Sequence, residues 1–167
     1  VEGYTGVGGI AGQMVKGSVT GSYNLGTLSS TRTATDASRE ALNMGGIVGD
    51  MTAATDPTKS ALIYDVYNAG TIGDSTYTYV GRHVGGIVGR FSGTLEKAYN
   101  TGDIYNGYSL VGGVVGWWNS GNITNVFNTG NITVVNRDTN GLNSHVGGIV
   151  GSVNAKRDDG PTKDTRH

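Results

Sequence analysis

Five copies of one short glycine-rich phrase constrain the fold of this chain more than any other feature. The copies read VGGIAG, MGGIVG, VGGIVG, VGGVVG and VGGIVG, and they begin at Val7, Met44, Val84, Val111 and Val146. Their first glycines are 27 to 40 residues apart. A second phrase, aromatic–Asn–x–Gly–x–aliphatic, follows the first four copies. A period of this length is typical of proteins in which each repeat packs mainly on its neighbours.

Alignment of the copies places side chains of one kind at matched positions, in three aliphatic rows and one aromatic row. The rows are Val19, Ile63, Leu95 and Ile123; Leu28, Ile72, Ile104 and Ile132; Ile10, Ile47, Ile87, Val114 and Ile149; and Tyr23, Tyr67, Tyr99 and Phe127. Short β-branched runs between Gly and Asn indicate strands. We predict an all-β fold, a parallel β-solenoid that forms a right-handed β-helix of about five coils with loop insertions, and we expect all four rows in its core.

The repeats define the expected domain organisation. Residues 1–151 form the solenoid, and the polar residues 152–167 form a C-terminal cap, a linker or a disordered tail. The extra length of the longer repeats lies in loops rich in Thr, Asp, Ser and Asn. Because Val1 follows no start methionine or signal-peptide pattern, we expect the chain to be a segment of a longer polypeptide joined to other domains.

The asparagine that follows each aromatic residue suits a corner of the coil, because Asn tolerates left-handed backbone and its amide can bond neighbouring backbone. Stacked asparagines can also bond to one another along the axis. Strict alternation after Ile63 would bury Asp65, so a bulge is predicted there. Asp65 and Lys97 then point outward on adjacent coils as an ion pair, and Asp50 and Arg90 form a second pair.

Composition excludes several classes of function. Lys and Arg number 12 against 13 Asp and Glu, so we expect neither nucleic acid nor a membrane surface as an electrostatic partner. The absence of cysteine excludes disulfides and thiolate metal sites. The apolar runs are far shorter than the roughly 20 residues that span a bilayer, so no direct membrane insertion is expected.

The residues of catalytic chemistry form no recognisable constellation. His83 and His145 occupy matched positions two coils apart, roughly 10 Å, which is too far to share a metal ion directly. The carboxylates are scattered, and no row carries two of them on neighbouring coils. We therefore predict that the chain is not an enzyme and has no catalytic residues, metal ligands or cofactors.

The aromatic residues outside the aromatic row are the candidate ligand-binding residues. They are Trp117, Trp118, Tyr77, Tyr79, Tyr105 and Tyr108. Trp117 shares a row with polar residues and is expected to point outward. Exposed aromatic rings stack on sugars and anchor protein contacts. The alternative is that Trp118 and the tyrosines cover the apolar rows beneath the loops.

The five G-[IV]-V-G-like phrases, followed by YN-x-G-x-I, resemble the GLUG motif repeats of bacterial surface and secreted proteins. The family's leucine position holds Ile or Val in every copy, and Ala11 stands where a bulky residue is usual. The resemblance spans about residues 6–151. It implies an extracellular setting, on the bacterial cell surface or secreted, as in filamentous-haemagglutinin-like adhesins and beside the catalytic domains of immunoglobulin A-cleaving metallopeptidases.

Three functions are compatible with these observations. The first is a non-catalytic extracellular module that acts as a rigid stalk or as an adhesion or ligand-binding surface for a host protein or glycan. The second is an accessory spacer or substrate-presenting domain of a secreted hydrolase such as an immunoglobulin A-cleaving metallopeptidase. The third is a carbohydrate-binding module that uses the exposed aromatics.

Overall fold

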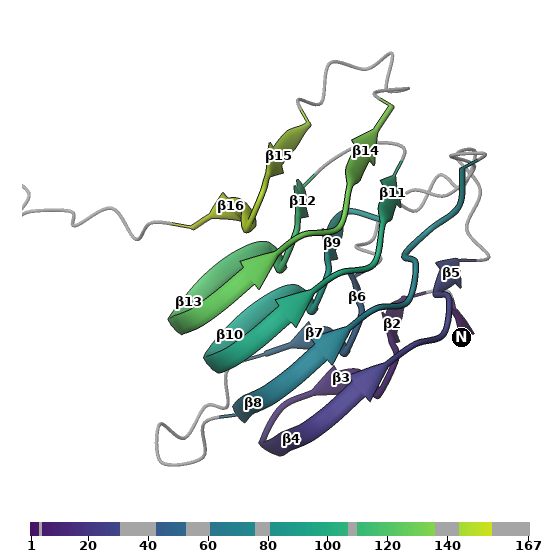
Figure 1. Ribbon diagram of the computed structural model, residues 1–167. Coiled ribbons are helices and arrows are strands. Elements are labelled where there is room, and N and C mark those ends of the chain that lie inside the picture. Colours follow the sequence, from purple (N-terminus) through teal and green to yellow (C-terminus); the bar gives the residue numbers. More distant parts are fainter. Residues whose placement is uncertain are drawn as a thin grey trace, which may run out of the picture.

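The computed structural model describes residues 1–3, 5–30, 43–52, 61–75, 81–106, 110–135 and 144–154. Within these ranges the chain forms short parallel strands that stack in sequence order (Figure 1). Tyr77, Tyr79 and Tyr108 lie outside the described residues, as do residues 155–167. We use the word coil for one copy of the glycine-rich phrase together with the strands that follow it.

A five-stranded parallel sheet contains the strand that opens each phrase. Its members are β2 (Gly6–Gly8), β6 (Asn43–Gly45), β9 (His83–Gly85), β12 (Leu110–Gly112) and β15 (His145–Gly147). They lie in the order β15-β12-β9-β6-β2. Val and Met of the phrase point into the core here, and Val7, Met44, Val84 and Val111 are all buried.

A seven-stranded parallel sheet contains the strands that close each phrase and those that lead to the asparagine. Its members are β3 (Ala11–Met14), β4 (Gly17–Asn24), β7 (Val48–Met51), β8 (Ala61–Asn68), β10 (Val88–Asn100), β13 (Val115–Asn128) and β16 (Val150–Val153). In the first two coils these strands are separate, whereas β10 and β13 are continuous and bend along the coil.

A third row of short pairings lies in the first four coils. Strand β1 (Glu2–Gly3) pairs with β5 (Ser29–Ser30), and β11 (Ile104–Asn106) pairs with β14 (Ile132–Val134). Parallel bridges from Leu28 to Ile72 and from Ile72 to Ile104 link these pairs. Every pairing in the described residues is parallel and joins neighbouring coils, as in a parallel β-solenoid.

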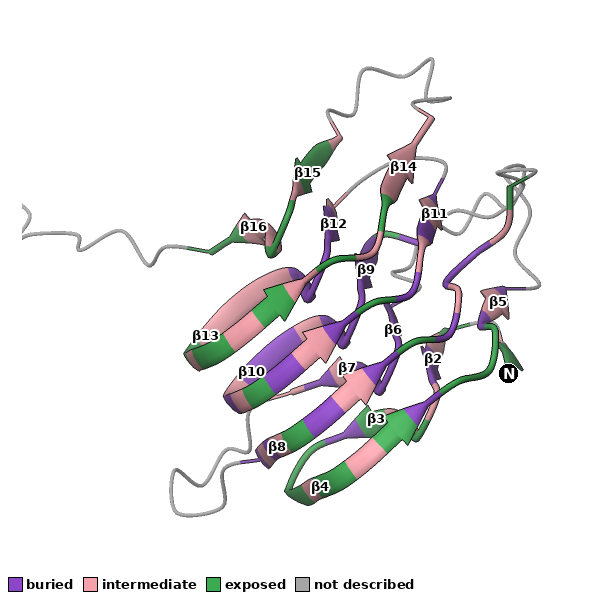
Figure 2. Cartoon of the chain, in the orientation of Figure 1, coloured by how far each residue is buried: buried purple, intermediate pink, exposed green. Residues whose placement is uncertain are grey.

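The register matches the sequence alignment. Tyr67 pairs with Tyr23 on one side and Tyr99 on the other, and Tyr99 pairs with Phe127. The aliphatic rows are buried in the middle coils, where Ile47, Ile63, Ile72, Ile87, Leu95 and Ile104 are all 0% exposed (Figure 2). The prediction of an all-β stack of parallel strands is therefore confirmed.

The expectation that the aromatic row lies in the core is wrong. The rings stack on one another with centroids 4.9 to 5.1 Å apart, but Tyr23 is 55% exposed and Phe127 is 50% exposed. Val66 and Ala98 take the inner position instead, each 1% exposed. The aromatic stack therefore forms an outer seam over the buried valine and alanine.

The predicted bulge explains this shift. Asp65, Lys97 and Asn125 have φ values of 55°, 52° and 54°, in the left-handed region that non-glycine residues rarely adopt. One left-handed residue interrupts the alternation, so the residue after it points inward and the aromatic residue points outward. Asp65 and Lys97 are exposed, as predicted.

The asparagine row forms a chain of side-chain hydrogen bonds along the axis. The amide nitrogen of Asn24 donates to Oδ1 of Asn68, that of Asn68 donates to Asn100, and that of Asn100 donates to Asn128, at 2.7 to 2.8 Å. Each amide also donates to the carbonyl of the glycine two residues later. These side chains hold both the corner of each coil and its register with the next.

Candidate functional site

Two rows of side chains flank the glycine-rich phrases, and their polar members form the candidate site. We call them the flanking rows. The first consists of Gly6, Asn43, His83, Leu110 and His145, and the second consists of Gln13, Asp50, Arg90, Trp117 and Ser152. The register of the second row agrees with the sequence alignment.

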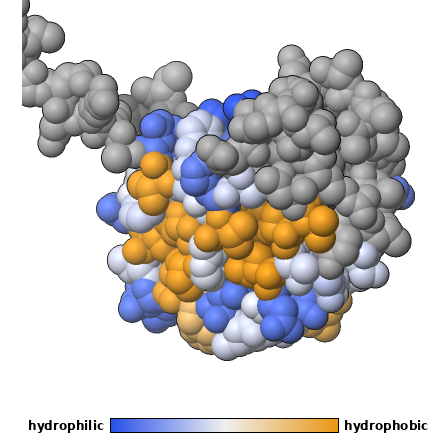
Figure 3. All heavy atoms as spheres, turned by 90° about the horizontal axis from the view of Figure 1, so that it is seen from above, coloured by the Kyte–Doolittle hydropathy of each residue, from blue (hydrophilic) through white to orange (hydrophobic). Residues whose placement is uncertain are grey.

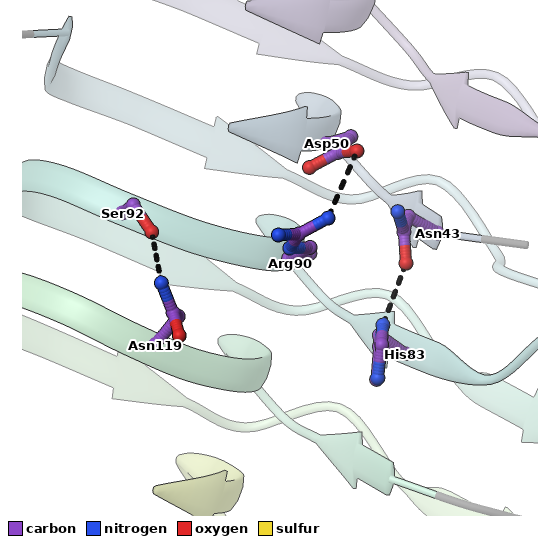
Figure 4. Close-up of polar contacts among 6 residues, drawn as sticks. All are labelled: Asn43, Asp50, His83, Arg90, Ser92 and Asn119. Carbon is purple, nitrogen blue, oxygen red and sulfur yellow. Dashed lines mark hydrogen bonds and ion pairs between the residues drawn. The ribbon is translucent and has the colours of Figure 1, made fainter. Parts of the chain in front are cut away.

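Asn43 and His83 form the most buried polar pair of the flanking rows. Nδ1 of His83 lies 2.6 Å from Oδ1 of Asn43, and the two residues are 5% and 4% exposed (Figure 4). Burial, together with the smaller effect of the positive charges of Arg82 and Arg90, lowers the pKa of His83 to about 4. The imidazole is therefore neutral near pH 7, and its Nδ1–H donates to the asparagine oxygen.

Asp50 and Arg90 form the cross-coil ion pair that the sequence predicts, with 3.9 Å between Oδ2 of Asp50 and a terminal guanidinium nitrogen of Arg90 (Figure 4). Burial raises the pKa of Asp50, while Arg90 and a hydrogen bond from Asn43 act in the opposite direction. Oδ1 of Asp50 and Nε of Arg90 are buried without a hydrogen-bond partner in the described residues. This pair fixes register rather than supplying much stability.

The Trp117 ring contacts two residues of the preceding coil. The His83 ring stacks on it with centroids 4.8 Å apart and planes 29° apart. The guanidinium carbon of Arg90 lies 5.3 Å from the centre of the Trp117 ring. The tryptophan is half-buried and packs against both flanking rows, so its larger role is to cover His83.

A cleft opens where the flanking rows reach the first coil. Its volume is about 310 Å³, and its lining residues are Thr5, Gly6, Gly12, Gln13, Asn43 and Asp50. Gly6 and Gly12 contribute only backbone to this lining. The lining offers amide, hydroxyl and carboxyl groups beside bare glycine backbone, which suits a small neutral ligand rich in hydroxyl or amide groups.

The other candidate aromatics that the structure describes lie apart from this cleft. Trp118 packs against the core cluster and donates from Nε1 to the carbonyl of Gly121 at 3.2 Å. Tyr105 lies in β11, which belongs to a different sheet from the two tryptophans. For Trp118, the alternative of a covering residue is therefore the one that the structure favours.

The predicted ion pair between Asp65 and Lys97 takes a different form. Nζ of Lys97 donates to the hydroxyl of Tyr64 at 2.6 Å and lies 4.8 Å from the centre of its ring. The pKa of Lys97 is raised, first by that hydrogen bond, and the charge of Asp65 contributes least. The sequence does not indicate the contact between Tyr64 and Lys97, because the predicted pairing was based on opposite charges alone.

A second polar row lies beyond the flanking rows on β10 and β13. The amide of Asn119 donates to Oγ of Ser92 at 3.0 Å (Figure 4). The amide of Asn154, which follows β16, donates to Oδ1 of Asn119 at 3.1 Å. Ser92 is buried. These contacts tie the last three coils together where β10 shifts register against β13.

The structure also bears on metal and membrane sites within its described ranges. No three or more His, Cys, Asp or Glu side chains there are grouped so that they could hold a metal ion. No helix in this part of the chain has the length and apolar character needed to cross a membrane.

Comparison with known proteins gives no assignment. A scan against protein-family models, a search of curated proteins and a search of solved structures return no match to this chain.

Proposed function

We propose that this chain is a right-handed parallel β-solenoid module of a bacterial surface or secreted protein, and that it acts as a non-catalytic rigid stalk. The observation that supports this role is the continuous register of the rows. Tyr23, Tyr67, Tyr99 and Phe127 stack without a break along the described coils. A structure in which each coil is fixed to the next by backbone, amide and ring contacts transmits force and holds distance along its axis.

The polar residues of the flanking rows support a structural role as well. Asn43 is committed to His83, His83 to Trp117, and Arg90 to both Asp50 and Trp117. Side chains that contact one another across neighbouring coils fix the orientation of each coil relative to the next. The resemblance to GLUG motif repeats supports the extracellular setting, and it is equally compatible with a spacer domain of a secreted hydrolase.

Rigidity can be measured directly because the chain has no cysteine. Thr20 and Thr124 are exposed and lie in one row, three coils apart. Spin labels on Thr20→Cys and Thr124→Cys should give one narrow distance distribution. A broad distribution would contradict the rigid stalk.

In the parent organism, antibodies to the module should label intact cells or the culture medium. Labelling of lysed cells alone would contradict the extracellular setting.

The cleft at the first coil favours a second candidate function, the binding of a neutral sugar or similar polyol. Asp50, Asn43 and Gln13 supply the acceptors and donors that such a ligand needs. A glycan array should then show binding that is lost in Gln13→Ala, while Thr124→Ala serves as an exposed control far from the cleft. If binding survives Gln13→Ala but not Trp117→Ala, the site lies at the aromatics instead.

A further inference from the structure

In the described residues, the fifth coil leaves part of β13 as an open strand edge. Strands β15 and β16 lie on β12 and β13, but β16 pairs only with the first part of β13, from Val115 to Trp118. Residues 121–128 of β13 have β10 on one side and no partner strand on the other in the described residues. An unpaired edge of this kind is a template for one more strand.

Apolar side chains are exposed at this end. Phe127 is 50% exposed, Ile149 36% and Val153 55%, although their counterparts in the middle coils are covered by the next coil. Figure 3 views the molecule from this side and shows an apolar patch across the visible face. This surface consists of the apolar side chains of a core layer, which in the described residues no further coil covers.

The fifth phrase retains a glycine whose usual neighbour is missing. In the four earlier phrases the second glycine lies against the row asparagine: a Cβ built on Gly9, Gly46, Gly86 or Gly113 would lie 2.4 to 2.6 Å from that side chain. A Cβ at Gly148 would have nothing within 4 Å. Gly148 therefore offers the same seat for an asparagine, and no described residue takes it.

The hydrogen bonds of the asparagine row point toward the same place. Each amide donates to Oδ1 of the asparagine one coil further on, from Asn24 to Asn128. Asn128 donates to the carbonyl of Gly130 at 3.0 Å. Its remaining amide hydrogen is directed as in the other coils, toward an acceptor on the next strand.

The backbone adds a requirement for glycine two residues after that asparagine. A Cβ on Gly70, Gly102 or Gly130 would lie 2.1 Å from the carbonyl oxygen of the matched glycine in the preceding coil. A strand that lies on β13 must meet the same condition against Gly130. The edge therefore selects for aromatic–Asn–x–Gly–x–aliphatic, with the aromatic ring stacked about 5 Å from Phe127, a normal offset-stacking distance.

We propose that this edge binds an extended segment of another polypeptide that carries the aromatic–Asn–x–Gly–x–aliphatic phrase, by addition of one parallel strand. The segment completes the fifth coil in trans. This inference does not depend on the cellular location or the stalk role proposed above.

Two other occupants fit less well. A whole second copy cannot place its β4 on residues 121–128, because its β2 and β3 would then coincide with β15 and β16, which already extend one coil further. Residues 155–167 of this chain contain no aromatic residue and no asparagine. A single strand from another repeat sequence satisfies all the contacts.

The test uses the full 167-residue chain and a labelled peptide that copies residues 94–104, TLEKAYNTGDI. We expect saturable binding in fluorescence anisotropy and amide shifts in NMR spectra that centre on Phe127 and Gly148. Peptides with Asn100→Ala or Gly102→Ala should bind at least tenfold more weakly. Absence of binding, or equal binding of all three peptides, would overturn the proposal.

A matched protein variant separates this site from other edges. Gly148→Val should fold normally, because the position is open and its φ lies outside the left-handed region, and it should abolish peptide binding by filling the asparagine seat. Thr20→Ala serves as the control, because Thr20 is exposed and lies in β4 of the first coil, three coils from residues 121–128 of β13. Binding that persists in Gly148→Val, or shifts confined to the Tyr23 end, would refute the proposal. Binding that appears only after removal of residues 155–167 would do the same, because it would show that the chain covers its own edge.

Discussion

Asn68 donates a hydrogen bond of 2.7 Å from its side-chain amide to Oδ1 of Asn100, one coil further along, and both residues are 0% exposed. Neither side chain can reach water if its partner is lost. The asparagine side chains therefore depend on one another for their hydrogen bonds, and the loss of a central member should lower the stability of the fold most.

Asn100→Ala should destabilise the fold by about 3 kcal/mol, because it leaves the amide of Asn68 and the carbonyl of Gly102 without their partners in a buried site. Asn24→Ala, at the other end of the row, removes only a donor from the row and should lower stability by about 1 kcal/mol, because Oδ1 of Asn68 still accepts a hydrogen bond from the amide of Gly70. Urea unfolding of the two variants measures the difference. Equal losses would show that the row is not coupled.

The glycines of the phrase provide a matched pair of substitutions. Gly113→Ala should destabilise the chain by about 3 kcal/mol or more, because its Cβ would lie 2.1 Å from the carbonyl oxygen of Gly148 and 2.5 Å from Asn128. Gly148→Ala should leave Tm within about 2 °C of the parent, as for a substitution without new contacts. Thermal unfolding followed by circular dichroism compares them, and a large loss in Gly148→Ala would contradict the open position.

Asp65→Gly should stabilise the fold by about 0.5 to 1 kcal/mol, because it relieves left-handed backbone strain at an exposed residue. Asp65→Val should do the reverse, since a β-branched residue tolerates this region poorly. Asn125→Gly is the control: asparagine already accommodates the conformation, so its effect should be smaller. Chemical denaturation of the three variants tests whether the bulge carries this strain.

Ile87→Asp should prevent stable folding, because a carboxylate would enter a fully buried aliphatic row without a partner, at a cost of several kcal/mol. Ile87→Val keeps the row apolar and should lower stability by about 1 kcal/mol. Cooperative melting of Ile87→Asp near the parent Tm would contradict the inward orientation of this row.

His83 should make stability depend on pH. Its folded pKa of about 4 lies below the ordinary value of 6.5, so between these values the unfolded chain binds a proton that the folded chain does not. Stability should therefore fall by up to about 3 kcal/mol as the pH drops through this window and then level off. The raised pKa of Asp50 acts in the opposite direction, because the folded state holds that proton more tightly.

His83→Gln isolates this effect, since glutamine can still bond Asn43 but does not titrate. The difference in unfolding free energy between parent and variant should change across pH 6.5 to 4, and the NMR titration of the His83 ring should have its midpoint near 4. His145→Gln removes an exposed histidine from the same row and is the control for the substitution itself. If the difference in unfolding free energy between the parent and His83→Gln does not vary with pH, His83 is not a buried neutral ring.

The stacking order and the pairing register follow from sequence alone because matched residues repeat at every coil. The orientation of the aromatic row does not follow, because one left-handed residue at Asp65 reverses the alternation for Val66 and Tyr67. Sequence indicates that a bulge is needed but not which of the next two residues turns inward. Only the packing of Val66 and Ala98 against the core decides that.

The candidate site was predicted in part. The row of Asp50, Arg90 and Trp117 follows from the alignment, and the Asp50–Arg90 pair lies where the sequence places it. The burial of His83 does not follow, because it depends on a tryptophan from the next coil folding back over the imidazole. The matched position of His83 beside that row is the signal that could have suggested it.

Strands pair only between neighbouring coils, and this should determine the order in which the coils unfold. Within the described residues, coils one and five each pair with a single neighbouring coil, whereas Tyr67 and Tyr99 lie between two coils. Amide hydrogen exchange should therefore be graded, fastest at β4 and β16 and slowest in β8 and β10, as in a zipper that frays from both ends. Mechanical load applied along the axis would peel such a molecule one layer at a time.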